Sequence, residues 1–162
     1  MRATFDAFAM CPGAEDVFLA LRGMRTMELR LREAERQALA LAQWLTQRRE
    51  VKTVLHPALP SHPGHAIWKR DFSGSSGLFS IILRPASETA VNAMLNSLAL
   101  FGLGFSWGGF ESLIIPFDCA SYRTATTWNP GGPALRLQIG LEDIEDLKED
   151  LERGFKVLRK GA

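Results

Sequence analysis

The chain has 162 residues and a mass of 18.0 kDa, which is room for one ordinary domain, and 46% of its residues are hydrophobic and 23% charged. This composition is typical of a folded protein and excludes a disordered chain, a collagen-like repeat and a disulfide-rich miniprotein. The 19 Lys and Arg residues nearly balance the 18 Asp and Glu residues, so the formal net charge is only +1. No global field attracts nucleic acid or an anionic membrane, and any function must come from a local site.

Two further features bear on the cellular compartment. Cys11 and Cys119 lie far apart and outside any CxxC spacing, so we expect reduced, buried thiols rather than a metal site or a disulfide. The first residues lack the apolar core of a secretory signal, and no window reaches the roughly 18 uninterrupted apolar residues of a membrane helix. These observations predict a soluble, cytoplasmic protein without a membrane partner.

The first half of the chain predicts a long helix followed by a strand. Apolar residues recur at spacings of three and four from Ala14 to about Gln47, which is typical of an amphipathic helix, with a break expected near Gly23. The short β-branched run of residues 51–56 predicts a strand, which Pro57 ends.

The middle of the chain predicts another strand between two helices. Residues 62–72 favour a short helix, residues 73–77 a turn, and residues 78–83 a second strand. Ser87 is the expected N-cap of a helix that continues to about Leu98.

The last third predicts three strands and a final helix. Strands are expected at residues 101–105, 113–115 and 134–139, the last with the period-two alternation of a half-covered strand. Glu142 and Asp143 are expected to begin a final helix, which an apolar stripe from Ile144 to Leu158 indicates. The order of elements predicts an α+β fold, with a small antiparallel or mixed sheet covered by helices and preceded by a long N-terminal helix.

The histidines do not form a convincing metal site. His56, His62 and His65 fall close together, but no Cys or paired acid lies nearby to complete a zinc centre, so we predict no metal. The chain has no GxGxxG or Walker loop, and Gly74–Gly77 is better interpreted as a strand turn than as a phosphate cradle.

The glycine-rich segment Phe101–Leu113 and Arg136 are the stronger candidates. Backbone amides in a glycine-rich segment can approach and hold a carboxylate, although a β-bulge or sheet corner would need the same glycines. Arg136 interrupts an apolar strand, and its planar guanidinium suits a carboxylate. The alternative for Arg136 is the solvent face of an edge strand.

Five blocks of the sequence carry a resemblance: Arg22–Thr26, Val54–Pro60, Trp68–Phe79, Ser106–Leu113 and Leu135–Asp143. Together they closely resemble the carboxy-terminal part of the bacterial cystathionine β-lyases. These enzymes belong to the pyridoxal-phosphate (PLP)-dependent family of cysteine and methionine metabolism, and their C-terminal part is the small domain of a fold-type I PLP-dependent enzyme.

The resemblance implies roles for particular residues. Arg136 matches the arginine that binds the α-carboxylate of the amino-acid substrate, and Ser106 with the backbone of Trp107 matches the segment that completes this pocket. The Ser-Trp-Gly-Gly motif is typical of β-lyases, whereas γ-lyases tend to have an acid where this chain has Phe105. The resemblance therefore favours β-elimination, which converts L-cystathionine to homocysteine, pyruvate and ammonia.

The resemblance also implies what is missing from these 162 residues. The Schiff-base lysine of the family lies in a Ser-x-x-Lys segment of the large domain, and none of the five lysines here has that context. We therefore expect no catalytic residue in this chain, PLP only in the complete enzyme, and no cofactor bound to the chain alone. Residues 1–22 would be a remnant of the large PLP-binding domain, and residues 23–162 the C-terminal small domain.

Three alternatives stay open at this stage. The chain could be a non-enzymatic truncated fragment that folds and self-associates, or a subunit that joins a separately encoded PLP domain in trans. It could also be the C-terminal domain of a related γ-lyase or γ-synthase. In the complete enzyme we expect a small-molecule amino-acid substrate and a homo-oligomer.

Overall fold

The computed structural model describes residues 2–8 and 11–161. The chain divides into two compact units, residues 1–30 and residues 31–162. Helix α3 (Met27–Leu45) begins in the first unit and continues into the second.

The N-terminal unit contains α1 (Arg2–Ala7) and α2 (Ala14–Met24) ahead of the first turn of α3. The predicted helix break near Gly23 is confirmed. The carbonyl of Gly23 accepts hydrogen bonds from Thr26 Oγ1 at 3.4 Å and from Arg30 Nη2 at 2.8 Å, so side chains occupy a carbonyl at the end of α2. Helix α2 has no buried residue among those described, and its large apolar side chains are exposed.

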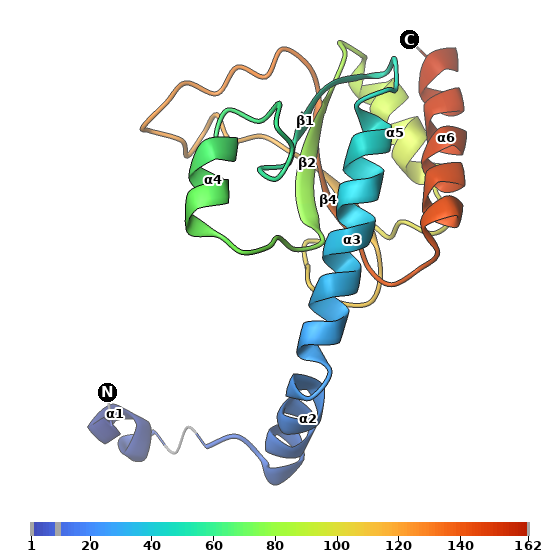
Figure 1. The fold of residues 1–162 in the computed structure, drawn as a ribbon. Helices are drawn as coiled ribbons and strands as arrows, with labels where there is room; N and C mark the ends of the chain where they lie inside the picture. Colours follow the sequence, from blue (N-terminus) through green and yellow to red (C-terminus); the bar gives the residue numbers. More distant parts are fainter. Residues whose placement is uncertain (1, 9–10, 162) are drawn as a thin grey trace. The chain divides into compact units, whose positions relative to one another are not determined.

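The larger unit is built on one antiparallel sheet, visible at the centre of Figure 1. Its strands are β1 (Val51–Leu55), β2 (Leu78–Leu83), β3 (Leu113–Phe117) and β4 (Ala134–Gln138). They are arranged in the order β1-β2-β4-β3, and every neighbouring pair is antiparallel. The α+β prediction is confirmed.

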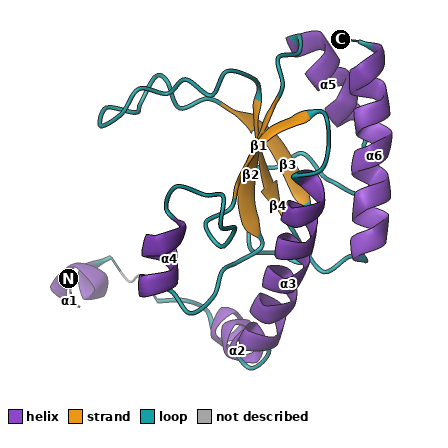
Figure 2. Ribbon diagram, turned by 45° about the horizontal axis from the view of Figure 1, so that its top comes forward, coloured by secondary structure: helices purple, strands orange, loops and turns teal. Residues whose placement is uncertain are grey.

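Three helices cover one face of this sheet, as Figure 2 shows. The second half of α3 packs there with α5 (Glu88–Asn96) and α6 (Ile144–Lys160), while the short α4 (His65–Asp71) lies apart from them. Both predicted helix starts are confirmed by their capping bonds. Ser87 Oγ accepts from Ala90 N at 3.2 Å, and Asp143 Oδ1 accepts from Glu145 N at 2.8 Å.

The predicted strand at residues 101–105 is wrong. That segment makes a single bridge, between Gly102 and Leu113, and the rest of it is loop. Glycines at positions 102 and 104 leave few side chains to pack on a pleated surface, so the segment does not extend the sheet.

Strand β4 is central, not half covered or at an edge. It pairs with β2 on one side and β3 on the other, so the edge-strand alternative for Arg136 is wrong. Of its five residues only Arg136 is not buried. The expectation of a half-covered strand is wrong because Ala134 and Gln138, which point to the face opposite Leu135 and Leu137, are buried as well.

The cysteines are less protected than expected. Cys11 is exposed and Cys119 half-buried, and both are free thiols, so the prediction of burial is wrong. Cys11 precedes α2, which has no packed core around it, and Cys119 lies in the loop after β3. In the part of the chain that the structure describes, no helix is long and apolar enough to span a membrane.

Candidate carboxylate-binding site

The position of Arg136 is fixed by the alternation of β4. Its neighbours Leu135 and Leu137 are fully buried in the core against the helices. Because successive side chains of a strand point to opposite faces, Arg136 projects from the face that the helical layer does not cover. Its register partners are Ser80 in β2 and Ile115 in β3.

The guanidinium of Arg136 holds the glycine-rich segment against this face. Arg136 Nη2 donates to the backbone carbonyl of Phe105 at 2.7 Å and lies 3.4 Å from the carbonyls of Gly104 and Ser106. The two sequence features singled out above, about 30 residues apart in the chain, therefore meet in space.

One donor of Arg136 has no partner. Its Nε is buried and makes no hydrogen bond with any described residue. Buried polar groups are almost always hydrogen-bonded, so this state is unusual, and Arg48 Nε is the other arginine donor in it among the described residues. A carboxylate is the acceptor whose geometry matches the guanidinium fork.

The segment beside Arg136 presents backbone and apolar side chains to solvent. Gly108 has φ = +83°, a conformation that side chains other than glycine rarely adopt. Ser106 is exposed, and Trp107 is 64% exposed. The residues implied for the carboxylate pocket thus lie in one stretch of accessible backbone, next to the unpartnered donor.

The C-terminal end of the glycine-rich segment is anchored at Ser112. Glu142 Oε1 accepts from Ser112 N at 2.7 Å, and Glu142 Oε2 accepts from Ser112 Oγ at 2.8 Å. The same Oγ accepts from Gly140 N at 2.9 Å, and Ser112 is fully buried. Sequence reasoning assigned Glu142 only to the start of the last helix and did not single out Ser112.

The N-terminal end is anchored by Asp150 of α6. This buried carboxylate accepts from the backbone amides of Ala99, Leu100 and Phe101 at distances of 2.8 to 3.2 Å. Arg153 also bonds to it, which compensates its charge. No local motif signals Asp150, because its partners lie about 50 residues away in the chain.

The histidines are held in other ways. His56 is buried, its Nδ1 accepts from Ala58 N at 3.2 Å, and its Nε2 has no partner among the described residues. Burial lowers the pKa of His56, and the nearby His62 lowers it further. Among residues 2–8 and 11–161, no group of three or more His, Cys, Asp or Glu is arranged to hold a metal ion.

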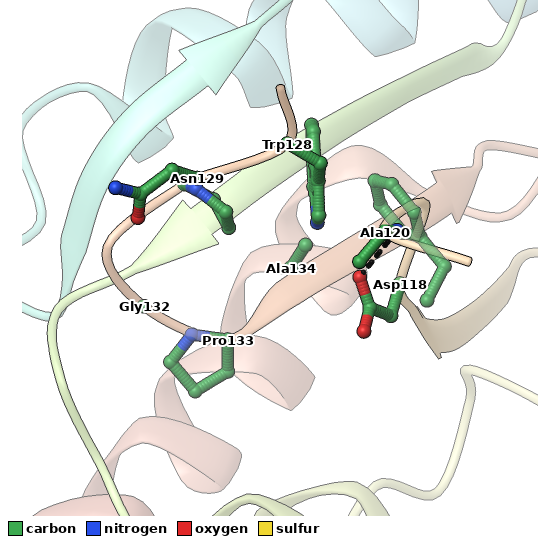
Figure 3. A pocket seen from close by; sticks show the side chains of 9 residues that line it. Asp118, Ala120, Trp128, Asn129, Gly132, Pro133 and Ala134 are labelled. Carbon is green, nitrogen blue, oxygen red and sulfur yellow. Dashed lines mark hydrogen bonds between the residues drawn. The ribbon is translucent and has the colours of Figure 1, made fainter. Parts of the chain in front are cut away.

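A hollow of about 370 Å³ opens where β3 ends and β4 begins (Figure 3). Its lining includes Asp118, Trp128 and Ala134, and Figure 3 shows the hydrogen bond that Asp118 Oδ1 accepts from Ala120 N. Arg136, Ser106 and Trp107 do not line it. The hollow is therefore separate from the candidate carboxylate site.

The lysines do not fit the role of a cofactor anchor. A Schiff-base lysine is held in a desolvated pocket, but none of the five lysines is buried. Lys52 Nζ donates to the carbonyl of Pro130 at 2.9 Å, and Lys148 pairs with Glu145 at 2.7 Å. We therefore assign no described residue to holding PLP and derive no chemical step through it in this chain.

Comparison with solved structures gives the class of protein. The structure of cystathionine gamma synthase from Xanthomonas oryzae pv. oryzae matches with a TM-score of 0.81 and 36% identity, over 96% of this chain and 41% of that one. The fold is thus that of the PLP-dependent transsulfuration enzymes. The family model for the Cys/Met metabolism PLP-dependent enzymes matches residues 3–156, and the chain belongs to this family.

Curated relatives agree with that assignment. The putative cystathionine beta-lyase of Rhizobium johnstonii is 49% identical over 150 residues, which is 90% of this chain and 38% of the relative. The cystathionine beta-lyase of Escherichia coli K12 is 44% identical over 147 residues, covering 88% of this chain and 37% of the relative. The chain therefore spans less than half the length of these relatives.

Proposed function

We propose that this chain is the substrate-carboxylate-binding C-terminal domain of a PLP-dependent cystathionine β-lyase. Residues 1–22 would belong to the large PLP-binding domain and residues 23–162 to the small domain. The observation that carries the proposal is the buried, unpartnered Nε of Arg136 beside the Gly104–Ser106 backbone. The relatives named above support the activity of the whole protein, of which this chain is one part.

The contribution of this chain is to orient the substrate. Arg136 donates to the α-carboxylate through Nε, while its Nη2 keeps the neighbouring loop in place. Ser106 and the backbone amide of Trp107 would donate to the same carboxylate. Fixing the carboxylate decides which bond at Cα faces the cofactor, and PLP when bound supplies the electron sink that weakens that bond.

Two residues support β-elimination over γ-chemistry. Phe105 is 83% exposed beside the site, and its side chain has no acid or base to move protons at the γ position of a substrate. Trp107, which is typical of β-lyases in the resemblance above, stands two residues further on. The second candidate is a γ-synthase domain, which the match to a cystathionine gamma synthase structure supports.

The exposed apolar side chains support association with further protein. Phe18, Leu21 and Met24 of α2 are each more than half exposed. Apolar surface of this kind fits a domain that contacts the large PLP domain, in cis or in trans, or a second copy of the chain in a homo-oligomer. A non-enzymatic fragment that self-associates would use the same side chains.

The lyase role is tested by pyruvate release from L-cystathionine. The purified chain with added PLP should release none, because none of its five lysines has the Ser-x-x-Lys context expected of the Schiff-base lysine, and adding the large domain of the same enzyme should restore release. Pyruvate formed by the chain alone would contradict the assignment of the chemistry to the large domain. Release of 2-oxobutyrate in place of pyruvate by the restored assembly would favour γ-chemistry.

A further inference from the structure

The glycine-rich segment is a loop closed at its base by Ser112. Gly102 N donates to the carbonyl of Ser112 at 3.0 Å, and Ile114 N donates to the carbonyl of Gly102 at 3.0 Å. Residues 103–111 therefore form a closed loop, which we call the arginine loop because Arg136 bonds to its carbonyls. A change at the base changes where those carbonyls lie.

Glu142 lies outside the loop and binds Ser112 at its base. Both of its carboxylate oxygens are used on Ser112, one on the amide and one on the hydroxyl, and the hydroxyl in turn accepts from Gly140 N. A second link, from Leu141 N to the carbonyl of Phe110 at 2.9 Å, lies beside it. Hydrogen bonds to a charged carboxylate are stronger than those between neutral groups. The two bonds between Glu142 and Ser112 are therefore the strongest contacts that hold this end of the loop.

We propose that Glu142 is a positioning residue for the carboxylate site. Acting through Ser112, it closes the base of the arginine loop and so fixes the carbonyls that Arg136 Nη2 contacts. Arg136 Nη2 then stays engaged on the loop, and Nε stays without a partner among the described residues. This inference rests on the proposed carboxylate-binding role of Arg136.

A purely structural role would give a different result from a positioning role. Glu142 immediately precedes the N-cap Asp143, so a structural role would tie α6 to the sheet and would change only stability. A positioning role also changes the order of the arginine loop and the affinity of Arg136 for a carboxylate. These two quantities are therefore the readouts.

The experiment uses the full 162-residue chain labelled with 15N. Backbone order parameters are measured for residues 104–109, and sodium acetate is titrated at constant ionic strength to obtain its dissociation constant. The variants are Glu142→Ala, the conservative Glu142→Gln, and Glu145→Gln as the matched control. Glu145 lies at the same end of α6 but bonds only to Lys148 through its side chain.

We expect order parameters in the loop to fall from about 0.85 to below about 0.6 in Glu142→Ala. The dissociation constant for acetate should rise about five- to tenfold, the scale of one lost hydrogen bond. Glu142→Gln should recover most of both values, since its amide can still accept from Ser112 N and donate to Ser112 Oγ. Glu145→Gln should match the wild type. A folded Glu142→Ala chain with wild-type loop order and wild-type affinity overturns the inference.

Two further results also test the inference: a Glu142→Ala chain that does not fold, and a wild-type chain that does not bind acetate. If Glu142→Ala does not fold, Ser112→Ala takes its place, because it removes only the hydroxyl bonds; unchanged loop order there overturns the inference, and reduced order supports it. If the wild-type chain shows no saturable response to acetate, the proposed carboxylate role fails. The order parameters still decide whether Glu142 fixes the loop.

Discussion

Arg136 Nη2 donates to the carbonyl of Phe105 at 2.7 Å, while Nε of the same guanidinium is buried and has no partner among the described residues. One side chain thus contacts the loop through Nη2 and keeps Nε available for a further acceptor, which we propose is a carboxylate. The division depends on the planar fork of arginine, because the guanidinium holds donors on three nitrogens in fixed relative directions, whereas an ammonium group has all its donors on one atom.

Arg136→Lys should therefore weaken carboxylate binding although it keeps the positive charge. We expect the dissociation constant for acetate to rise about tenfold, equivalent to about 1.4 kcal/mol. The measurement is an NMR titration at constant ionic strength, followed on the amides of Gly104 and Gly108. Equal affinity in the lysine variant would show that charge alone, and not the guanidinium geometry, accounts for binding.

Gly140 has to be glycine because the backbone of the arginine loop passes against it. A Cβ at this position would collide with the carbonyl of Phe110, which is backbone and cannot move aside. Gly140→Ala should reduce the free energy of unfolding by about 1–3 kcal/mol. Gly109→Ala in the same loop is the matched control, since its nearest neighbour would be a Glu111 side-chain oxygen at 3.5 Å. Urea unfolding compares the two, and a loss as large in Gly109→Ala would contradict the explanation.

The elements with local signals could be predicted from the sequence, and those that depend on distant partners could not. Ser87 and Asp143 cap helices as their positions indicate, because an N-cap is decided within a few residues. Arg136 stood out as a charge in an apolar strand.

The bonds that shape the site join residues far apart in the chain. Ser112 and Glu142 are 30 residues apart, and Phe101 and Asp150 are 49 residues apart. No spacing rule relates such pairs, because they come together through the order of the strands, which the residues near either partner do not determine. Arg136 could be interpreted as an edge-strand residue for the same reason, because the sequence pattern does not give the strand order.

Glu50 joins the start of β1 to the last helix through a buried carboxylate. Burial acts to raise the pKa of Glu50, but hydrogen bonds from Arg159 and Arg49 outweigh it and hold the pKa below its ordinary value of 4.5. The charged form is therefore favoured in the folded state. The stability this supplies is present above pH 4.5 and is lost as the pH falls through the lowered pKa.

Glu50→Gln should reduce the free energy of unfolding at pH 7 by about 1–3 kcal/mol. The reduction should shrink as the pH is lowered below 4.5, where the wild-type carboxylate also becomes protonated. Urea unfolding at pH 7, 5 and 4 measures the difference between the two chains. A difference that does not change with pH would show that the charge of Glu50 does not contribute.

His56 should make the protein less stable in mild acid. Because burial holds its pKa below the ordinary 6.5, the unfolded chain takes up a proton in a range where the folded chain does not. Stability should therefore fall as the pH drops through 6.5, by at most about 1.4 kcal/mol per pH unit.

His56→Asn keeps an acceptor for Ala58 N but removes the titrating ring. We expect its unfolding free energy to depend less steeply on pH between 7.5 and 5.5 than that of the wild type, with pH 8 as the common baseline. A slope equal to the wild-type slope would assign the pH dependence to other groups.

The central claim is that Arg136 Nε is a free donor that receives a carboxylate, and the Nε–H resonance of this residue reports on it directly. Its 15N–1H signal is identified by its loss in Arg136→Lys and is followed during an acetate titration at constant ionic strength. We predict a saturable downfield shift of the proton, together with shifts of the amides at residues 104–108. A signal that stays in place to the end of the titration, or that moves linearly like the other arginines, would contradict the account.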